Sequence, residues 1–275
     1  MRATAREVVG AYAAVQSSVV RGSYDLVLED APDAIHAARV ACRRLRSTLR
    51  TYGPLWLGGR GAVRRQLAWY ARLLGTSRDL EVVSAWLAEL RSDPLLAEVP
   101  ASDLEDLYEH ALSRRTTALS TLRQELHREP FDTLAALLPP ANWSPLSELP
   151  ADEVLPPMAA AQVLLVRAEA EALPTGVHRT EALHEVRKTA KLVRYAYEVL
   201  GPAATADASH WKRVTEALGV TQDAAVATCV VSDLRELKPE SVQTWDAVDA
   251  VLTARAQAAE ATGLALIGHR TGTPA

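Results

Sequence analysis

Hydrophobic positions recur along this chain every three to four residues, which is the period of an amphipathic helix. Apolar and polar residues do not alternate over any long segment, and no Asn-Gly or Asp-Gly pair marks a tight hairpin. Breakers such as Gly53-Pro54 and Gly201-Pro202 interrupt the helical pattern. The pattern predicts an all-α chain with helices at about 4–21, 31–52, 61–74, 77–92, 102–128, 155–172, 178–200, 206–218, 221–236 and 241–264.

A proline-rich segment over 139–157 divides this pattern. Its sequence, PPANWSPLSELPADEVLPP, contains six prolines, and each proline removes a helical hydrogen bond and crowds the preceding turn. We expect it to link two helical halves, 1–138 and 155–264, of one domain that spans 1–275. The end of the chain, 268–275, is expected to be a disordered tail.

The two halves also match each other in detail. The segment HAARVACRRLR, which begins at His36, returns 148 residues later as HEVRKTAKLVR, which begins at His184. The segment LGTSRD, which begins at Leu74, returns 144 residues later as LGVTQD, which begins at Leu218. Two matches in the same order indicate an internal duplication. They predict two helical bundles that are related by a pseudo-twofold axis and face each other across a shared cleft.

Each repeated segment predicts a helix with one cationic face. At 100° per residue, basic residues spaced by three and four lie on one face, and apolar residues such as Cys42 and Leu45 lie on another. Arg44 and Lys188 fall outside the cationic faces and are expected to be solvated. The first stripe is His36, Arg39, Arg43, Arg46 and Arg50. The second stripe is His184, Arg187, Lys191 and Arg194. Further candidate cations on neighbouring helices are Arg65, Arg72 and Lys212.

The overall charge does not suggest a polyanion ligand, because the 275-residue chain has a formal net charge of −4. The distribution of charge along the chain does suggest such a ligand, because between His36 and Arg78 there are 10 arginines and no acid. A charged helix face is usually only a solvated surface, but its repetition in both halves favours a function. Guanidinium groups bind phosphate oxygens in pairs, and at ~1.5 Å per residue the first stripe is roughly 20 Å long. This length suits an extended polyanion.

The clustered cations should also lower the pKa values of His36 and His184 while the site is empty.

A metal site is the first alternative. Asp33-x-x-His36 and Glu181-x-x-His184 resemble half of the ligand set of carboxylate-bridged di-metal bundles. The cations that follow each histidine would repel a metal ion, and both acids also suit the first turn of a helix without a further role. We therefore expect neither a metal nor a cofactor.

Signatures of catalysis are missing from the sequence. There is no glycine-rich phosphate loop, no Gly-x-Ser-x-Gly elbow and no His-Glu-x-x-His segment. Asp79 and Asp223 are the best candidate carboxylates, but helix capping or the orientation of a nearby cation explains them more simply. We expect a binding module and not an enzyme.

These residues together resemble the CHAD family, the conserved histidine α-helical domain. The resemblance rests on the His-x-x-Arg segments from His36 and His184 and on the two Leu-Gly segments, and it extends to about residue 264. It implies paired four-helix bundles around a basic pore, binding of inorganic polyphosphate without catalysis, and a cytoplasmic protein that associates with polyphosphate granules. It assigns binding to both stripes, although Arg50 departs from the repeat because Glu198 stands at its counterpart. The family is often fused to a CYTH domain, and the Glu-x-Glu-x-Lys signature of that domain does not occur in this sequence.

Two other partners remain open at this stage. A nucleic-acid backbone would suit the stripes equally well, but no aromatic residue for base stacking is interleaved with the cations, so nucleic acid is the weaker hypothesis. A metal-dependent phosphohydrolase is the other. No apolar run approaches the ~20 residues that a membrane span needs, and no feature indicates an obligate protein partner.

Overall fold

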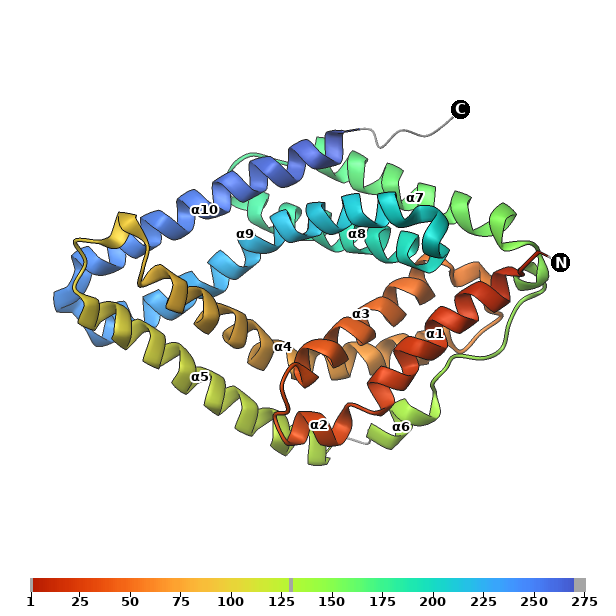
Figure 1. Cartoon of the computed structure of the whole chain (residues 1–275), viewed down its shortest axis with the longest axis horizontal. Helices are drawn as coiled ribbons and strands as arrows, with labels where there is room; N and C mark the ends of the chain where they lie inside the picture. The colour runs from red at the N-terminus through yellow and green to blue at the C-terminus, as the bar shows by residue number, and fades with distance from the viewer. Residues whose placement is uncertain (1, 129–130, 270–275) are drawn as a thin grey trace.

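The computed structural model describes residues 2–128 and 131–269, and within these ranges the chain is helical, without a strand. Figure 1 shows long helices that run along a flattened, elongated molecule, with shorter ones at the turns. The all-α prediction is confirmed. The α-helices are α1 (Ala5–Arg21), α2 (Tyr24–Leu28), α3 (Ala34–Thr51), α4 (Arg60–Leu90), α5 (Ala101–Arg128), α6 (Phe131–Ala136), α7 (Ala151–Glu171), α8 (Arg179–Leu200), α9 (Thr205–Leu237) and α10 (Val242–Gly268).

The predicted breaks near residues 75 and 219 are wrong, because α4 and α9 each run through them as one helix. Gly75 and Gly219 take ordinary helical backbone angles and do not adopt the positive φ found at Gly59, Gly176 and Gly201. A glycine inside a helix costs only about 0.5–1 kcal/mol relative to alanine, which the packing of two long amphipathic segments offsets.

The predicted linker is shorter than its proline content suggested. Helix α7 begins at Ala151, directly after Pro150, and contains Pro156 and Pro157. Both prolines lie in the second turn, where each removes a helical hydrogen bond, and burial of Leu155 and Ala159 beside them stabilises this part of the helix. The end of the chain also differs, because α10 continues to Gly268, and the rest of the predicted tail, 270–275, lies outside the described residues.

The remaining part of the linker is attached to the first half of the chain. Trp143 stacks on Trp56, with ring centroids 4.7 Å apart. The amide of Leu57 donates to the carbonyl of Asn142 at 3.0 Å, and the amide of Ser144 donates to the carbonyl of Leu55 at 2.8 Å. This segment therefore packs as ordered structure against the end of α3.

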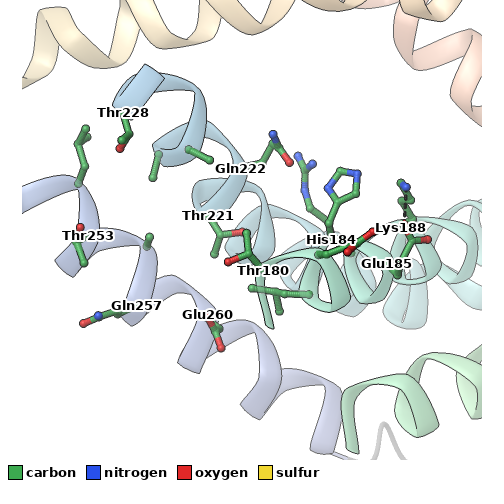
Figure 2. Close-up of a pocket in the computed structure, with 17 residues that line it drawn as sticks. Thr180, His184, Glu185, Lys188, Thr221, Gln222, Thr228, Thr253, Gln257 and Glu260 are labelled. Carbon is green, nitrogen blue, oxygen red and sulfur yellow. Dashed lines mark hydrogen bonds and ion pairs between the residues drawn. The ribbon is translucent and has the colours of Figure 1, made fainter. Parts of the chain in front are cut away.

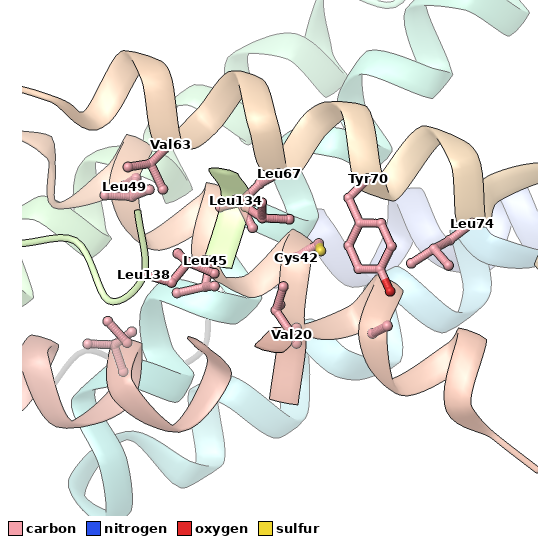
Figure 3. Packing of buried hydrophobic residues seen from close by; sticks show 14 of the residues in the cluster. Val20, Cys42, Leu45, Leu49, Val63, Leu67, Tyr70, Leu74, Leu134 and Leu138 are labelled. Carbon is pink, nitrogen blue, oxygen red and sulfur yellow. The ribbon is translucent and has the colours of Figure 1, made fainter. Parts of the chain in front are cut away.

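Three hydrophobic cores lie among the described residues. The first gathers α1, α3, α6, the N-terminal part of α4, the C-terminal part of α5, the start of α7 and the C-terminal part of α8. Figure 3 shows part of its packing around Cys42, Leu45, Leu67 and Tyr70. The second is formed by α4 and α5 together with α9 and α10, and the third by α7 to α10. Because the second core takes helices from both halves, the halves are locked together, which the sequence did not predict.

The apolar faces predicted for the two stripe helices are confirmed. Ala38, Cys42, Leu45 and Leu49 of α3 are at most 1% exposed, and the same face of α8 is buried at Val186, Ala190 and Val193. Helix α3 packs against α8, and the hydroxyl of Tyr52 donates to the carbonyl of Ala196 at 2.8 Å. Burial of these faces turns the cationic faces towards the middle of the molecule.

No helix in the described ranges is both long and apolar enough to cross a lipid bilayer.

Candidate functional site

Helices α3, α4, α8 and α9 together line a cavity of about 290 Å³, here called the central cavity. The first stripe contributes from α3 and the second from α8, so the structure brings the two predicted stripes together. The charged and imidazole side chains of the lining are His36, Arg39, Arg43, Arg78, Asp79, His184, Arg187 and Asp223.

A second cavity, of about 370 Å³, adjoins the central cavity between α3 and α4. We call it the arginine cavity. The two cavities share Arg39, Arg43 and Asp79, and Arg46 and Arg72 extend the second one further along α3 and α4. The basic side chains therefore follow one continuous path.

Asp79 holds one of the shared arginines in place. Nη1 of Arg39 donates to Oδ1 of Asp79 at 2.6 Å and to the carbonyl oxygen of Gly75 at 3.0 Å. Asp79 lies within α4, far from its ends, so the capping interpretation is wrong for it and the cation-orienting one is confirmed. The first stripe is thus not free of acids in three dimensions, because a carboxylate arrives from the neighbouring helix.

Two cations of the second stripe are largely buried without an acid at ion-pair distance. In the described part of the chain, neither Arg187 nor Lys191 forms an ion pair, and Nε of Arg187 has no hydrogen-bond partner. Burial and the neighbouring guanidinium of Arg43 lower the pKa of Lys191 to about 5, and burial also lowers the pKa of Arg187. Burial raises the pKa of Asp223 on the opposite wall, although Arg187 counteracts this shift.

The two histidines at the heads of the stripes show the predicted pKa direction. Burial lowers the pKa of His36 first, and Arg78 lowers it further. Burial also lowers the pKa of His184, with Lys188 as the next cause. Desolvation is thus the larger cause, and the clustered cations are the smaller one.

The far end of the second stripe is occupied by an ion-pair network. Glu198 accepts from Nε of Arg194 at 3.0 Å, from Nε of Arg44 at 2.8 Å and from the hydroxyl of Tyr12 at 3.1 Å. The prediction that Arg44 is solvated is therefore wrong: it is partly buried and lies over the ring of Tyr195. Arg194 already has an acidic partner, so it differs from the rest of its stripe.

Five of the predicted basic residues do not line either cavity: Arg50, Arg65, Lys191, Arg194 and Lys212. Arg50 and Arg65 are exposed on α3 and α4, and exposed Lys212 is 3.6 Å from Glu216 on its own helix. The structure adds two residues that the sequence analysis did not include, Arg78 and Gln222. Both occupy the same position of the repeated Leu-Gly segment, so the repeat itself was the available signal.

The residues of the metal alternative lie at the starts of their helices. Asp33 precedes the first residue of α3 in a left-handed conformation with φ of 58°, and exposed Glu181 lies in the first turn of α8. Lys188, which was expected to be solvated, is exposed and pairs with Glu185 at 2.6 Å. The described residues contain no group of three or more His, Cys, Asp or Glu side chains that could hold a metal ion.

Comparison with known proteins gives a consistent result. A family model described as the CHAD domain matches residues 11–232. Two uncharacterized proteins from two strains of Mycobacterium tuberculosis are each 31% identical over 214 residues, which cover 73% of this chain and 40% of each relative. The match thus spans about two fifths of the length of these curated relatives.

Two solved structures share the fold. PptA from Streptomyces chartreusis superposes with a TM-score of 0.79 at 21% identity, covering 96% of this chain and 98% of the other. The CHAD domain from the plant Ricinus communis superposes with a TM-score of 0.66 at 19% identity, covering 98% and 93%. At these identities the likeness concerns the fold alone.

Proposed function

The chain belongs to the CHAD domain family, and from this premise we propose that it binds inorganic polyphosphate in the central and arginine cavities without transforming it. The proposal includes association with polyphosphate granules in the cytoplasm. It needs no cofactor, metal, membrane or obligate protein partner.

The observation that carries this proposal is the burial of Arg187 on α8, in the wall of the central cavity and without an ion pair among the described residues. Desolvating a charge is costly unless a partner replaces the lost water, and neither Arg187 nor Lys191 has an acidic partner among the described residues. A phosphate chain in the central cavity would supply oxygen acceptors to Arg187. Its negative charge would also favour protonation of Lys191, whose pKa of about 5 leaves the amine neutral at pH 7 in the empty protein. The cost of burying the Arg187 guanidinium in the empty protein is the cost of a site prepared for an anion.

The continuity of the two cavities favours a polymer over a single phosphate. Arg39 and Arg43 belong to both cavities, so an anion that fills the central cavity leads directly to Arg46 and Arg72. Guanidinium groups at successive turns match the repeated phosphoryl oxygens of a linear chain.

Binding without catalysis agrees with how the two cavity acids are arranged. Asp79 is engaged by Arg39 at 2.6 Å. Asp223 faces Arg187, whose charge it partly balances. We assign to both acids the role of holding guanidinium groups in place while the site is empty.

The test is binding of long-chain polyphosphate as a function of salt. Replacement of His36, Arg39, Arg43 and Arg46 together by Ala should abolish binding, because four cation positions of one path are lost. The wild-type protein should bind more weakly with increasing salt and more tightly with increasing chain length, since each engaged cation releases counterions. A matched control, Arg6, Arg21 and Arg65 replaced by Ala, removes three exposed charges outside both cavities and should bind like the wild type.

Three outcomes would contradict the proposal. Wild-type affinity of the fourfold variant would show that the site lies elsewhere. Preference for single-stranded RNA over polyphosphate in competition would favour the nucleic-acid alternative, and steady phosphate release with Mg²⁺ or Mn²⁺ would show an enzyme.

A further inference from the structure

A third and larger cavity opens between α8, α9 and α10, with a volume of about 800 Å³ (Figure 2). We call it the threonine cavity. Six of its twelve polar side chains are uncharged hydroxyls and amides. They are Thr180, Thr221, Gln222, Thr228, Thr253 and Gln257.

The threonine cavity is continuous with the proposed phosphate site. It shares His184, Arg187 and Gln222 with the central cavity. Two of its basic side chains, His184 and Arg187, are therefore at the end that meets the phosphate path. At the other walls two acids are paired, since Lys188 lies 2.6 Å from Glu185 and Glu260 lies 2.6 Å from Arg179, and Glu181 is a further acid of the lining. A ligand group that extends to Thr228 and Thr253 meets neutral hydroxyls.

Two threonine hydroxyls of this cavity differ from those on other helix surfaces, whereas the hydroxyl of Thr221 donates to the carbonyl of Leu218 at 2.9 Å. Thr116, Thr121 and Thr262 donate to the carbonyl four residues before them, as threonines in helices commonly do. Thr228 and Thr253 make no such bond in the described structure. Figure 2 shows them on α9 and α10, on opposite sides of the opening. Their hydroxyls remain available to a ligand.

At the position that corresponds to this cavity, the first half of the chain has a larger apolar side chain. Under the offset of 144 residues, Ala224 in the threonine cavity corresponds to Leu80, which is buried in the second hydrophobic core. The small side chain leaves space where the first half places an isobutyl group. The cavity thus gives the second half a compartment that the sequence repeat does not require.

We propose that the threonine cavity binds the sugar of a sugar-linked oligophosphate whose phosphates lie in the central cavity. This inference rests on the proposed function. Threonine hydroxyls and glutamine amides both donate and accept hydrogen bonds, as ring hydroxyls do. No aromatic side chain lines the cavity within the described ranges, so a nucleobase would find no stacking surface. The ligand class is a ribonucleoside 5′-triphosphate recognised through ribose and phosphate, irrespective of the base.

Calorimetry with two nucleotides of equal charge tests this proposal. ATP and 2′,3′-dideoxy-ATP differ only in two ribose hydroxyls, and ATP should bind about tenfold more tightly if two hydrogen bonds are lost. GTP, CTP and UTP should bind like ATP. The double variant Thr228→Val and Thr253→Val keeps side-chain shape but removes two hydroxyls, and it should reduce the ATP advantage to about twofold or less. Its affinity for inorganic tripolyphosphate should equal that of the wild type.

Thr262→Val is the matched control, because it changes a threonine of α10 outside the cavity and should keep the full ATP advantage. Equal binding of ATP and its dideoxy analogue by the wild type would overturn the inference. So would an undiminished ATP advantage in the double variant. Failure of the wild type to bind polyphosphate or tripolyphosphate would overturn the proposed function, and this inference with it.

Discussion

The stripe helices α3 and α8 carry nearly the same sequence pattern but have different electrostatic surroundings. On α3, Arg39 is held by Asp79 at 2.6 Å, and the last stripe cation, Arg50, is exposed. On α8 the relation is reversed: the first basic residues after the histidine are buried without an ion pair, and the last one, Arg194, is held by Glu198. A repeated sequence motif therefore specifies where cations stand, while the neighbouring helices decide which of them are free for a ligand.

The largest expected effect on binding comes from removing Arg39, the cation of α3 that is paired with Asp79. Arg39→Ala should weaken polyphosphate binding about 100-fold, because it removes a cation and leaves the Asp79 carboxylate facing the anion. Arg187→Ala removes a cation without stripping an ion pair and should cost about tenfold. Titration of each variant with polyphosphate at fixed salt measures both.

A second change sharpens this result. Asp79→Asn in the Arg39→Ala background should recover part of the lost affinity, since the unpaired carboxylate is gone. If the double variant binds no better than Arg39→Ala, repulsion by Asp79 does not explain the larger loss.

The next effect concerns pH and the α8 side. The pKa values of His36, His184 and Lys191 are lowered in the empty protein, that of Lys191 to about 5, and a bound polyanion should raise them. Between the empty and bound pKa values, binding then takes up protons, so affinity should fall about tenfold from pH 6 to pH 8. Calorimetry in buffers of different ionisation enthalpy measures the uptake. A pH-independent affinity with no uptake would contradict this account.

A smaller effect on affinity should follow from breaking the ion pairs of Glu198 near the C-terminal end of α8. Glu198→Gln removes the charge that pairs with Arg194 and Arg44, so polyphosphate should bind severalfold more tightly. The same change weakens three hydrogen bonds, and the free energy of unfolding should fall by about 1–3 kcal/mol. Glu216→Gln, which changes an exposed acid on α9, is the control. Unchanged affinity in a folded Glu198→Gln protein would show that Arg194 lies off the ligand path.

The smallest effect is on the stability of the empty protein. Lys191→Met should raise the melting temperature by roughly 2–4 °C at pH 7, because it replaces a desolvated amine by an apolar side chain. The unfolded chain binds the proton more tightly than the folded one between about pH 5 and 10.5, so wild-type stability rises with pH there and the gain from Lys191→Met shrinks. Thermal melts across this window test both statements. Lys212→Met, at an exposed lysine, should change neither.

The sequence predicted most of the helices and the first part of each stripe, because helical periodicity is a local property. It placed His36, Arg39, Arg43, His184 and Arg187 correctly, since their spacing alone puts them on one face of each helix. It missed what depends on packing between distant segments: the continuous helices α4 and α9, the core shared by both halves, and the acids that reach the stripes from neighbouring helices.

The limits of prediction from the sequence are clearest at Arg44 and Arg78. Arg44 points away from the cationic face and was expected in solvent, but α1 and α8 bring Tyr12 and Glu198 to it. Arg78 was visible in the repeated segment, yet a supposed turn obscured its position on a helix that lines the central cavity. Neither contact is encoded within one element.

The unbroken course of α4 and α9 has a mechanical consequence. Each helix connects two hydrophobic cores: α4 joins the first to the second, and α9 joins the third to the second. Gly75 and Gly219, the most compliant residues in their neighbourhoods, lie within one turn of Arg78 and Gln222 in the cavity wall. A ligand that contacted both Arg78 and Gln222 would restrain both helices close to these glycines.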